Sequence, residues 1–153
     1  MSHASAGAHQ VVKCFAASLH LLFGQTRRDA SLGDSDAFSF ILDTYRDRQN
    51  GFVFGTNPTG LEYDGQVTNE GEGGRGLGSS LGGLNTNWDA SWTVEADVNE
   101  AGWSAEFAIP FSTLRYNRKA TTTWRLNFQR NIRRRNERAF WSPLSRQFNI
   151  LRL

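Results

Sequence analysis

Apolar side chains recur at every second position over much of the chain from Asp36 onward, which is the spacing of a half-buried β-strand. The stretch DAFSFILDTY begins this pattern, and GFVFGT and LEYDGQVT continue it on either side of the tetrapeptide NPTG. Proline at the second position and glycine at the fourth suit a type I turn. Residues 52–67 are therefore predicted to form a β-hairpin.

A second hairpin and a further strand are predicted downstream. NWDASWTVEADV alternates between apolar and polar residues, NEAG provides a turn, and WSAEFAIP returns until Pro110 ends the strand pairing. TWRLNFQR then directs Trp124, Leu126 and Phe128 toward a core and its arginine and amide side chains toward the other face. Strands at this spacing, joined by hairpins and glycine turns, predict an all-β fold: an antiparallel β-sandwich with jelly-roll or immunoglobulin-like layers.

Two segments do not follow the strand pattern. Residues 1–25 suggest a short helix with no partner for its apolar side, and we expect this atypical segment to be foreign or disordered. Residues 71–83 contain seven glycines in thirteen positions and are predicted to be a flexible loop. The predicted sandwich therefore occupies residues 26–153. The apolar run within residues 11–24 is too short to span a membrane and makes no convincing signal peptide.

Composition narrows the classes of function. The 153 residues amount to one domain, and 17 basic against 15 acidic side chains create no large positive field of the kind that attracts nucleic acid. The single cysteine, Cys14, excludes an intrachain disulfide and a zinc site built on cysteines. His3, His9 and His20 all lie in the atypical first segment, which argues against a Ser-His-Asp triad. Since no catalytic constellation is evident, we expect a protein that is not an enzyme.

Six arginines lie between the two tryptophans of WRLNFQRNIRRRNERAFW, residues 124–141. Phosphate contacts, helped by stacking on Phe140 and Trp141, would make residues 125–138 a nucleic-acid-binding segment. Glu137 and the neighbouring asparagines interrupt the charge, which favours ion pairs with nearby strands or hydrogen bonds to a polar ligand. Nucleic-acid binding is kept as the less favoured alternative.

The five tryptophans divide into candidate core and candidate ligand residues. Trp92, Trp103 and Trp124 lie mid-strand, in register with aliphatic side chains, as core residues do. Trp88 and Trp141 lie at the ends of their elements, where an exposed indole can stack on the apolar face of a pyranose ring. These two are the predicted ligand-binding tryptophans.

Three aspartates lie near the first secure strand, where carboxylate oxygens could gather around calcium. They are Asp34, Asp36 and Asp43, and their spacing matches no known calcium loop. Capping and turn hydrogen bonds are the alternative role for these side chains. Calcium is the only cofactor for which the sequence offers candidate ligands.

Three blocks of the sequence resemble the family 9 carbohydrate-binding module. They are TRRDASLGDSDAFSFILDTYRDRQNGFVFGTNPTGLEYDGQV, NWDASWTVEADVNEAGWSAEFAIPFSTLRY and WRLNFQRNIRRRNERAFWSPL, within residues 26–144. The version that they resemble most lies at the N-terminus of uncharacterised bacterial outer-membrane proteins, ahead of a β-barrel. The resemblance implies an antiparallel β-sandwich that binds poly- or oligosaccharides without cleaving them, in association with glycoside hydrolases and polysaccharide catabolism.

The resemblance also implies a location, a partner and a site. The location is the envelope of a Gram-negative bacterium, periplasm or outer membrane, and the partner besides carbohydrate is an outer-membrane barrel domain. The counterparts of the family's ligand contacts are Trp88, Trp141, Asn127 and Arg130. Because residues 1–25 do not match the family's opening strands, we expect a sandwich that is incomplete at its N-terminal edge. A structural or interaction domain that binds no sugar is the alternative function.

Overall fold

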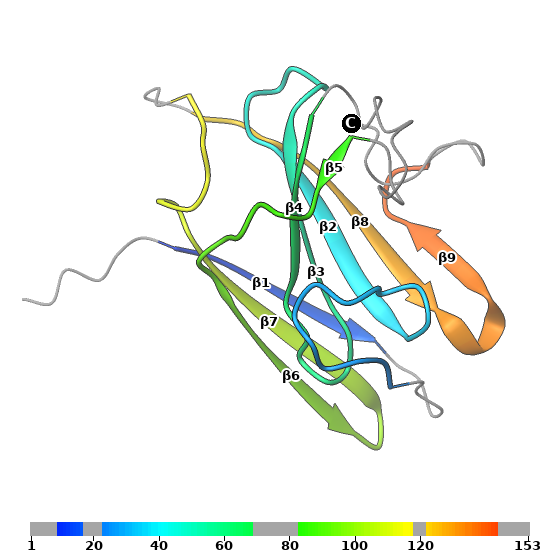
Figure 1. The fold of residues 1–153 in the computed structure, drawn as a ribbon. Helices are drawn as coiled ribbons and strands as arrows, with labels where there is room; N and C mark the ends of the chain where they lie inside the picture. The colour runs from blue at the N-terminus through cyan, green and yellow to red at the C-terminus, as the bar shows by residue number, and fades with distance from the viewer. Residues whose placement is uncertain (1–8, 17–22, 69–82, 118–121, 144–153) are drawn as a thin grey trace, which may run out of the picture.

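The computed structural model describes residues 9–16, 23–68, 83–117 and 122–143, the first of these ranges by its backbone alone. In this part of the chain, nine β-strands form two antiparallel sheets (Figure 1). The smaller sheet has the strand order β1-β7-β6, and the larger has the order β5-β4-β3-β2-β8-β9. The strands are β1 His9–Ala16, β2 Ala37–Asp43, β3 Gly51–Thr56, β4 Tyr63–Val67, β5 Leu84–Asn85, β6 Thr93–Asn99, β7 Gly102–Pro110, β8 Arg125–Ile132 and β9 Glu137–Phe140. This architecture confirms the predicted antiparallel β-sandwich.

Both predicted hairpins are present. β3 pairs with β4 so that Phe54 lies opposite Asp64. The turn between them is closed by a 3.0 Å hydrogen bond from the Gly60 N–H to the Asn57 carbonyl. Gly60 has a φ of 76°, a left-handed conformation that strains other residues, because a Cβ atom would crowd the backbone. β6 and β7 form the second hairpin, antiparallel and paired over the full length of β6.

β1 differs from the sequence prediction. It is a strand whose eight residues all pair antiparallel with β7, so the helix expected in this segment is wrong. The pairing gives the backbone groups of β7 hydrogen-bond partners on the side away from β6, and this stabilises the strand. The two adjacent valines of HQVVKCFA also favour a strand, because branching at Cβ restricts the side chain in a helix.

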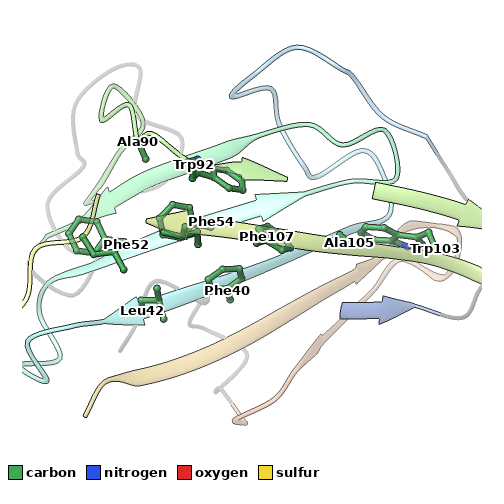
Figure 2. Packing of buried hydrophobic residues seen from close by; sticks show 11 residues of the cluster. Phe40, Leu42, Phe52, Phe54, Ala90, Trp92, Trp103, Ala105 and Phe107 are labelled. Atoms are coloured by element: carbon green, nitrogen blue, oxygen red, sulfur yellow. The ribbon is translucent and has the colours of Figure 1, made fainter. Parts of the chain in front are cut away.

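The main core fills the space between the two sheets. Figure 2 shows Phe40 and Phe54 of the larger sheet close to Phe107 of β7. The rings of Phe40 and Phe107 meet edge to face at 5.1 Å, and Trp92 stacks on Phe107 at 5.6 Å. Such aromatic pairs add to the stability gained by burial. Trp92 and Trp103 are both buried, which confirms the prediction that they are core residues.

A smaller apolar cluster lies on the opposite face of the larger sheet. It is formed by Ile41, Val53, Val67 and Leu84, with Tyr63 and Phe140 packed against it. β2 and β3 therefore carry apolar side chains on both faces, and nearly all their residues are buried.

Several expectations remain predictions. Residues 71–82, most of the glycine-rich loop, lie outside the described residues. The division of the chain at residue 25 and the incomplete N-terminal edge also stay predictions. Within the described ranges, the structure holds no helix with the length and apolar character that crossing a bilayer requires.

Candidate functional site

The arginine-rich stretch forms a β-hairpin at one edge of the larger sheet. β8 is followed by a 3₁₀ turn, η2 (Arg133–Arg135), and β9 returns beside β8 (Figure 1). Asn136 follows the turn with a left-handed φ of 51°, and its N–H donates to the Arg133 carbonyl at 2.9 Å. Asparagine adopts this conformation more readily than most residues with a Cβ atom. The arginines of η2 therefore lie on a tight turn between two paired strands and not on an independent arm.

One face of β8 continues the inner face of the sandwich. β8 pairs with β2 so that Phe128 lies opposite Phe40 and Leu126 lies opposite Leu42. Directly paired residues share a face of a sheet, and so do residues two apart on one strand. Arg130 therefore lies on the same face as Phe128.

β9 extends this face by one more strand. Ala139 lies opposite Arg130 across the β8–β9 pair. Two residues later, the ring of Trp141 meets the ring of Phe128 edge to face at a centroid distance of 6.3 Å, which places the indole on the same side. We call this surface the β8–β9 platform and define it as Leu126, Phe128, Arg130, Ala139 and Trp141.

The platform is open to solvent although it is continuous with the core. Trp141 is 79% exposed and Leu126 is 43% exposed. Phe128 is half-buried, and its ring lies 5.6 Å from that of Phe38 and 6.2 Å from that of Phe40. The exposed indole thus contacts a ring that is itself anchored in the core. A large aromatic side chain that is both exposed and rigidly supported is typical of a binding surface.

The backbone around Trp141 is held by two residues of β8. The Trp141 N–H donates to the Phe128 carbonyl at 3.0 Å, and the Ser142 N–H donates to Asn127 Oδ1 at 2.9 Å. The Asn127 amide donates back to the Ser142 carbonyl at 3.4 Å. Asn127 is only 9% exposed and alternates with the platform residues along β8. The structure therefore places its side chain beside the Trp141 backbone and away from the platform surface.

Trp88 lies apart from the platform. Its ring packs against Phe52 at 4.9 Å and Phe54 at 6.1 Å, both on β3. β2 separates β3 from β8 in the sheet. Of the four predicted ligand residues, the structure brings Trp141, Asn127 and Arg130 together on the β8–β9 hairpin and places Trp88 at the rim of the core.

Alternation along the strand assigned Leu126 and Phe128 to the core, and the structure adds both to the platform. Phe128 packs against core rings and also contacts Trp141. Leu126 differs from the prediction of a core residue, because much of its surface faces solvent. Pairing the strand with the segment that ends at Trp141, on the far side of the arginine turn, would have identified both residues. Trp124 is half-buried and meets Tyr116 edge to face at 5.4 Å, so it is a rim residue rather than a fully buried one.

The three aspartates proposed for calcium do not gather. Asp36 precedes β2 and accepts a 3.1 Å hydrogen bond from the Arg133 N–H. Asp43 ends β2, a strand of seven residues that spans about 23 Å, and it accepts the N–H groups of Asp47 at 3.3 Å and Arg48 at 3.1 Å. Among the described residues, no three His, Cys, Asp or Glu side chains form a group that could hold a metal ion. The two buried carboxylates, Asp36 and Asp43, serve backbone hydrogen bonds at opposite ends of one strand, which is the capping and turn role given as the alternative to calcium.

A second polar cluster, the Arg28 cluster, joins Arg28 to Glu62, Asp64 and Asp89. The Asp64 carboxylate is fully buried and accepts hydrogen bonds from the Ala90 N–H at 2.8 Å, the Trp92 indole N–H at 3.2 Å and Arg28 at 2.9 Å. Arg28 also bonds the Ala90 carbonyl at 2.9 Å and pairs with Asp89 at 2.7 Å and with Glu62. These bonds tie β4 to the segment before β6, so we assign the cluster a structural role.

Asp29 lies beside the Arg28 cluster. Burial raises the pKa of the Asp29 carboxyl, a hydrogen bond from the Asp64 N–H opposes the rise, and the negative charge of Asp64 adds to it. Burial also raises the pKa of the neighbouring Tyr63 hydroxyl, with a smaller contribution from the Asp29 charge. β3 and β2 separate β4, which carries Asp64, from β8. These shifts therefore belong to the structural cluster and not to the platform.

No family model matches the chain, and the search of curated proteins found no match either. Among solved structures, the fold is similar to that of a "putative carbohydrate-binding protein" from Bacteroides uniformis, with a TM-score of 0.55. The two chains are 15% identical, and the match covers 89% of this chain and 63% of that one. This chain thus spans less than two thirds of the length of its structural neighbour. At this identity the likeness establishes the fold, an antiparallel β-sandwich shared by the two proteins.

Proposed function

We propose that this chain is a non-catalytic carbohydrate-binding β-sandwich and that it holds sugar against the β8–β9 platform, with Trp141 as the stacking ring. The observation that carries the proposal is that Trp141 is 79% exposed while its backbone is hydrogen-bonded to β8 on both sides of its Cα atom. The axial C–H groups of a pyranose form an apolar face that matches an indole plane. Because the indole support is already ordered, binding loses little conformational entropy.

The platform also offers polar recognition. Sugar hydroxyls need directional hydrogen-bond partners, and the Arg130 guanidinium lies on the same face as Phe128 with five N–H donors. Leu126 and Phe128 supply further apolar area beside the indole. An apolar surface with a few placed polar groups is the usual composition of a small-molecule site. Asn127 contributes indirectly by holding the chain at Ser142.

Two further observations support the proposal. The structural neighbour from Bacteroides uniformis is described as a putative carbohydrate-binding protein, and three sequence blocks resemble the family 9 carbohydrate-binding module. On the strength of that resemblance we extend the proposal to a family 9 type of module, associated with polysaccharide catabolism in a Gram-negative cell envelope, with a barrel domain as a further partner.

Isothermal titration against xylan, cello-oligosaccharides and monosaccharides tests the proposal. We expect heat of binding with at least one of these ligands and a loss of affinity of about tenfold or more in Trp141→Ala. Tyr45→Ala is the matched control, because Tyr45 is an exposed aromatic on the loop after β2, and this variant should bind like the wild type. No heat with any saccharide, or equal affinities of Trp141→Ala and wild type, would contradict the proposal. The first of these results would favour a protein-interaction domain instead.

A further inference from the structure

We infer that the saccharide held on the platform is acidic, and that Arg130 binds a uronic acid carboxylate while Trp141 stacks on the sugar ring. This inference rests on the proposed function and narrows its ligand class. It adds charge recognition to a surface whose apolar part would accept neutral and acidic sugars alike.

Arg130 and Trp141 lie close enough to contact one ligand. Arg130 is two residues along β8 from Phe128, the residue whose ring supports the indole, and such neighbours lie about 7 Å apart on one face. The strand position directly opposite Arg130 is Ala139, two residues before Trp141. Ala139 is exposed and has only a methyl side chain, so no bulky side chain of β9 stands between the Arg130 and Trp141 positions. A sugar ring on Trp141 can therefore direct a substituent toward Arg130.

The hairpin that carries this surface is positively charged as a whole. Residues 125–138 contain six arginines and one glutamate. Arg134, Arg135 and Arg138 are exposed and, within the part of the chain that the structure describes, form no ion pair. Unpaired surface cations raise the local concentration of an anionic ligand. The net charge of the whole chain is only +2, so this positive field is a property of the hairpin.

Among the described residues, several acidic side chains lie near the hairpin, including Asp36, whose carboxylate accepts the Arg133 N–H at 3.1 Å. Asp34 lies 4.0 Å from Arg133, and the Asp43 carboxylate lies 3.7 Å from Arg125 on the opposite face of β8. Glu137 shares the face of Ala139 and Trp141 on β9, because it lies two residues before Ala139. Glu137 is thus the acidic residue of β9 on the platform side, and its removal should strengthen binding of an anion.

A carboxylate suits Arg130 better than a hydroxyl does. The planar guanidinium can donate two parallel N–H bonds to the two oxygens of a carboxylate, and such charge-assisted bonds are stronger than neutral ones. With five N–H donors, Arg130 can bind a ligand and still keep contacts within the protein. A neutral sugar in the same position would use the guanidinium without this gain.

The experiment compares trigalacturonate with its fully methyl-esterified form, in which each carboxylate is replaced by a neutral methyl ester. For the wild type we expect the acid to bind at least about tenfold more tightly than the ester at low salt. Arg130→Gln should remove this preference by weakening binding of the acid far more than binding of the ester, and Glu137→Gln should increase the preference. Trp141→Ala should weaken the binding of both ligands. Arg130→Lys, which keeps the charge but not the two-pronged geometry, should retain part of the preference even if Arg130→Gln folds poorly.

The outcomes separate the two proposals. If acid and ester bind the wild type with equal affinity and Trp141→Ala weakens both, the acidic ligand is overturned while the carbohydrate-binding function stands. The same holds if acid and ester bind equally in the wild type and also in Arg130→Lys. No binding of either form, nor of any neutral saccharide, overturns both. Tighter binding of a single-stranded oligonucleotide than of trigalacturonate, with affinity falling steeply as salt rises, assigns the hairpin to nucleic acid and also overturns the inference.

Discussion

Asn127 Oδ1 accepts a 2.9 Å hydrogen bond from the backbone N–H of Ser142, fifteen residues along the chain. The same oxygen accepts the Phe128 N–H at 3.0 Å. One buried amide therefore links the strand that carries Phe128 to the residue that follows Trp141. Ser142 directly follows Trp141, which itself follows Phe140, the last residue of β9. The position of the exposed indole therefore depends on this bond.

We predict that Asn127→Ala weakens saccharide binding more than its effect on folding would suggest. Removal of a hydrogen-bonded buried amide should lower the free energy of unfolding by about 1–3 kcal/mol. It should also reduce affinity, since the Trp141 segment loses its fixed position and binding must then order it. Urea denaturation and isothermal titration on the same preparation measure the two effects.

Asn131→Ala is the matched control for Asn127. Asn131 lies on β8, and its amide donates to the Ser35 carbonyl at 2.7 Å, at the end of the strand away from Trp141. A similar loss of stability with unchanged affinity is expected. If the two variants lose affinity equally, the loss reflects general destabilisation and the role assigned to Asn127 is wrong.

Within the Arg28 cluster, the buried and the exposed carboxylate should differ in their contribution to stability. Asp64→Ala should lower the free energy of unfolding by about 3–5 kcal/mol, because it leaves the Trp92 indole N–H, the Ala90 N–H and Arg28 without their buried acceptor. Asp89 pairs with the same guanidinium at 2.7 Å, but its side chain is 81% exposed. Asp89→Ala should cost about 1 kcal/mol or less. Equal costs, measured by urea denaturation, would refute the structural role of Asp64.

Local patterns were enough to predict most of the strands. The hairpins β3–β4 and β6–β7 follow from alternation on either side of short turns, and both the alternation and the turn residues are visible within about ten residues. β1 could not be predicted in this way. Its partner β7 lies more than eighty residues away, and pairing at that distance leaves no periodic signal in the segment itself.

The candidate site was predictable in part for the same reason. Exposure of Trp141 follows from its position after β9, whereas the support given by Asn127 depends on a bond across the arginine turn. Trp88 was also placed at the end of an element, yet its ring packs on Phe52 of β3, a strand of the larger sheet. A position at the end of a strand therefore identifies a side chain that could be exposed. Only the packing of strands distant in the sequence decides which of these side chains is exposed and which is buried.

Asn136 offers a test of the arginine turn that carries the platform. The Asn136 backbone has a φ of 51°. Asn136→Ala should lower the free energy of unfolding by about 1 kcal/mol, because an alanine Cβ is crowded in the left-handed region and the alanine side chain forms no compensating bond. Asn136→Gly should be close to neutral, since glycine tolerates this φ and loses only an exposed 3.1 Å bond to Arg133. Thermal or urea denaturation of this pair isolates the backbone conformation. Equal stability of the two variants would mean that the turn relaxes away from the left-handed conformation.

Asp29 and Asp47 should change stability with pH in opposite directions. For Asp29, burial raises the pKa above 3.8, so the folded protein holds the proton more tightly than the unfolded chain does. Ionisation of Asp29 therefore costs stability above the raised pKa, and the cost disappears as the pH falls to below 3.8. Asp29→Asn should be more stable than the wild type at pH 7, and the difference should vanish near pH 3.

For Asp47, burial acts to raise the pKa, but hydrogen bonds from the Asn50 side chain and from the N–H groups of Asn50 and Gln49 outweigh it and lower the pKa below 3.8. The ionised form is the one that the fold favours, so its contribution is present above pH 3.8 and is lost as the pH falls through the lowered pKa. Asp47→Asn should therefore be less stable than the wild type at pH 7, with a difference that shrinks toward acid pH. Urea midpoints of wild type and both variants at pH 7 and pH 3 measure these differences. Two variants that shift the pH 7 midpoint in the same direction would show that burial and hydrogen bonding do not act on these carboxyls as the contacts indicate.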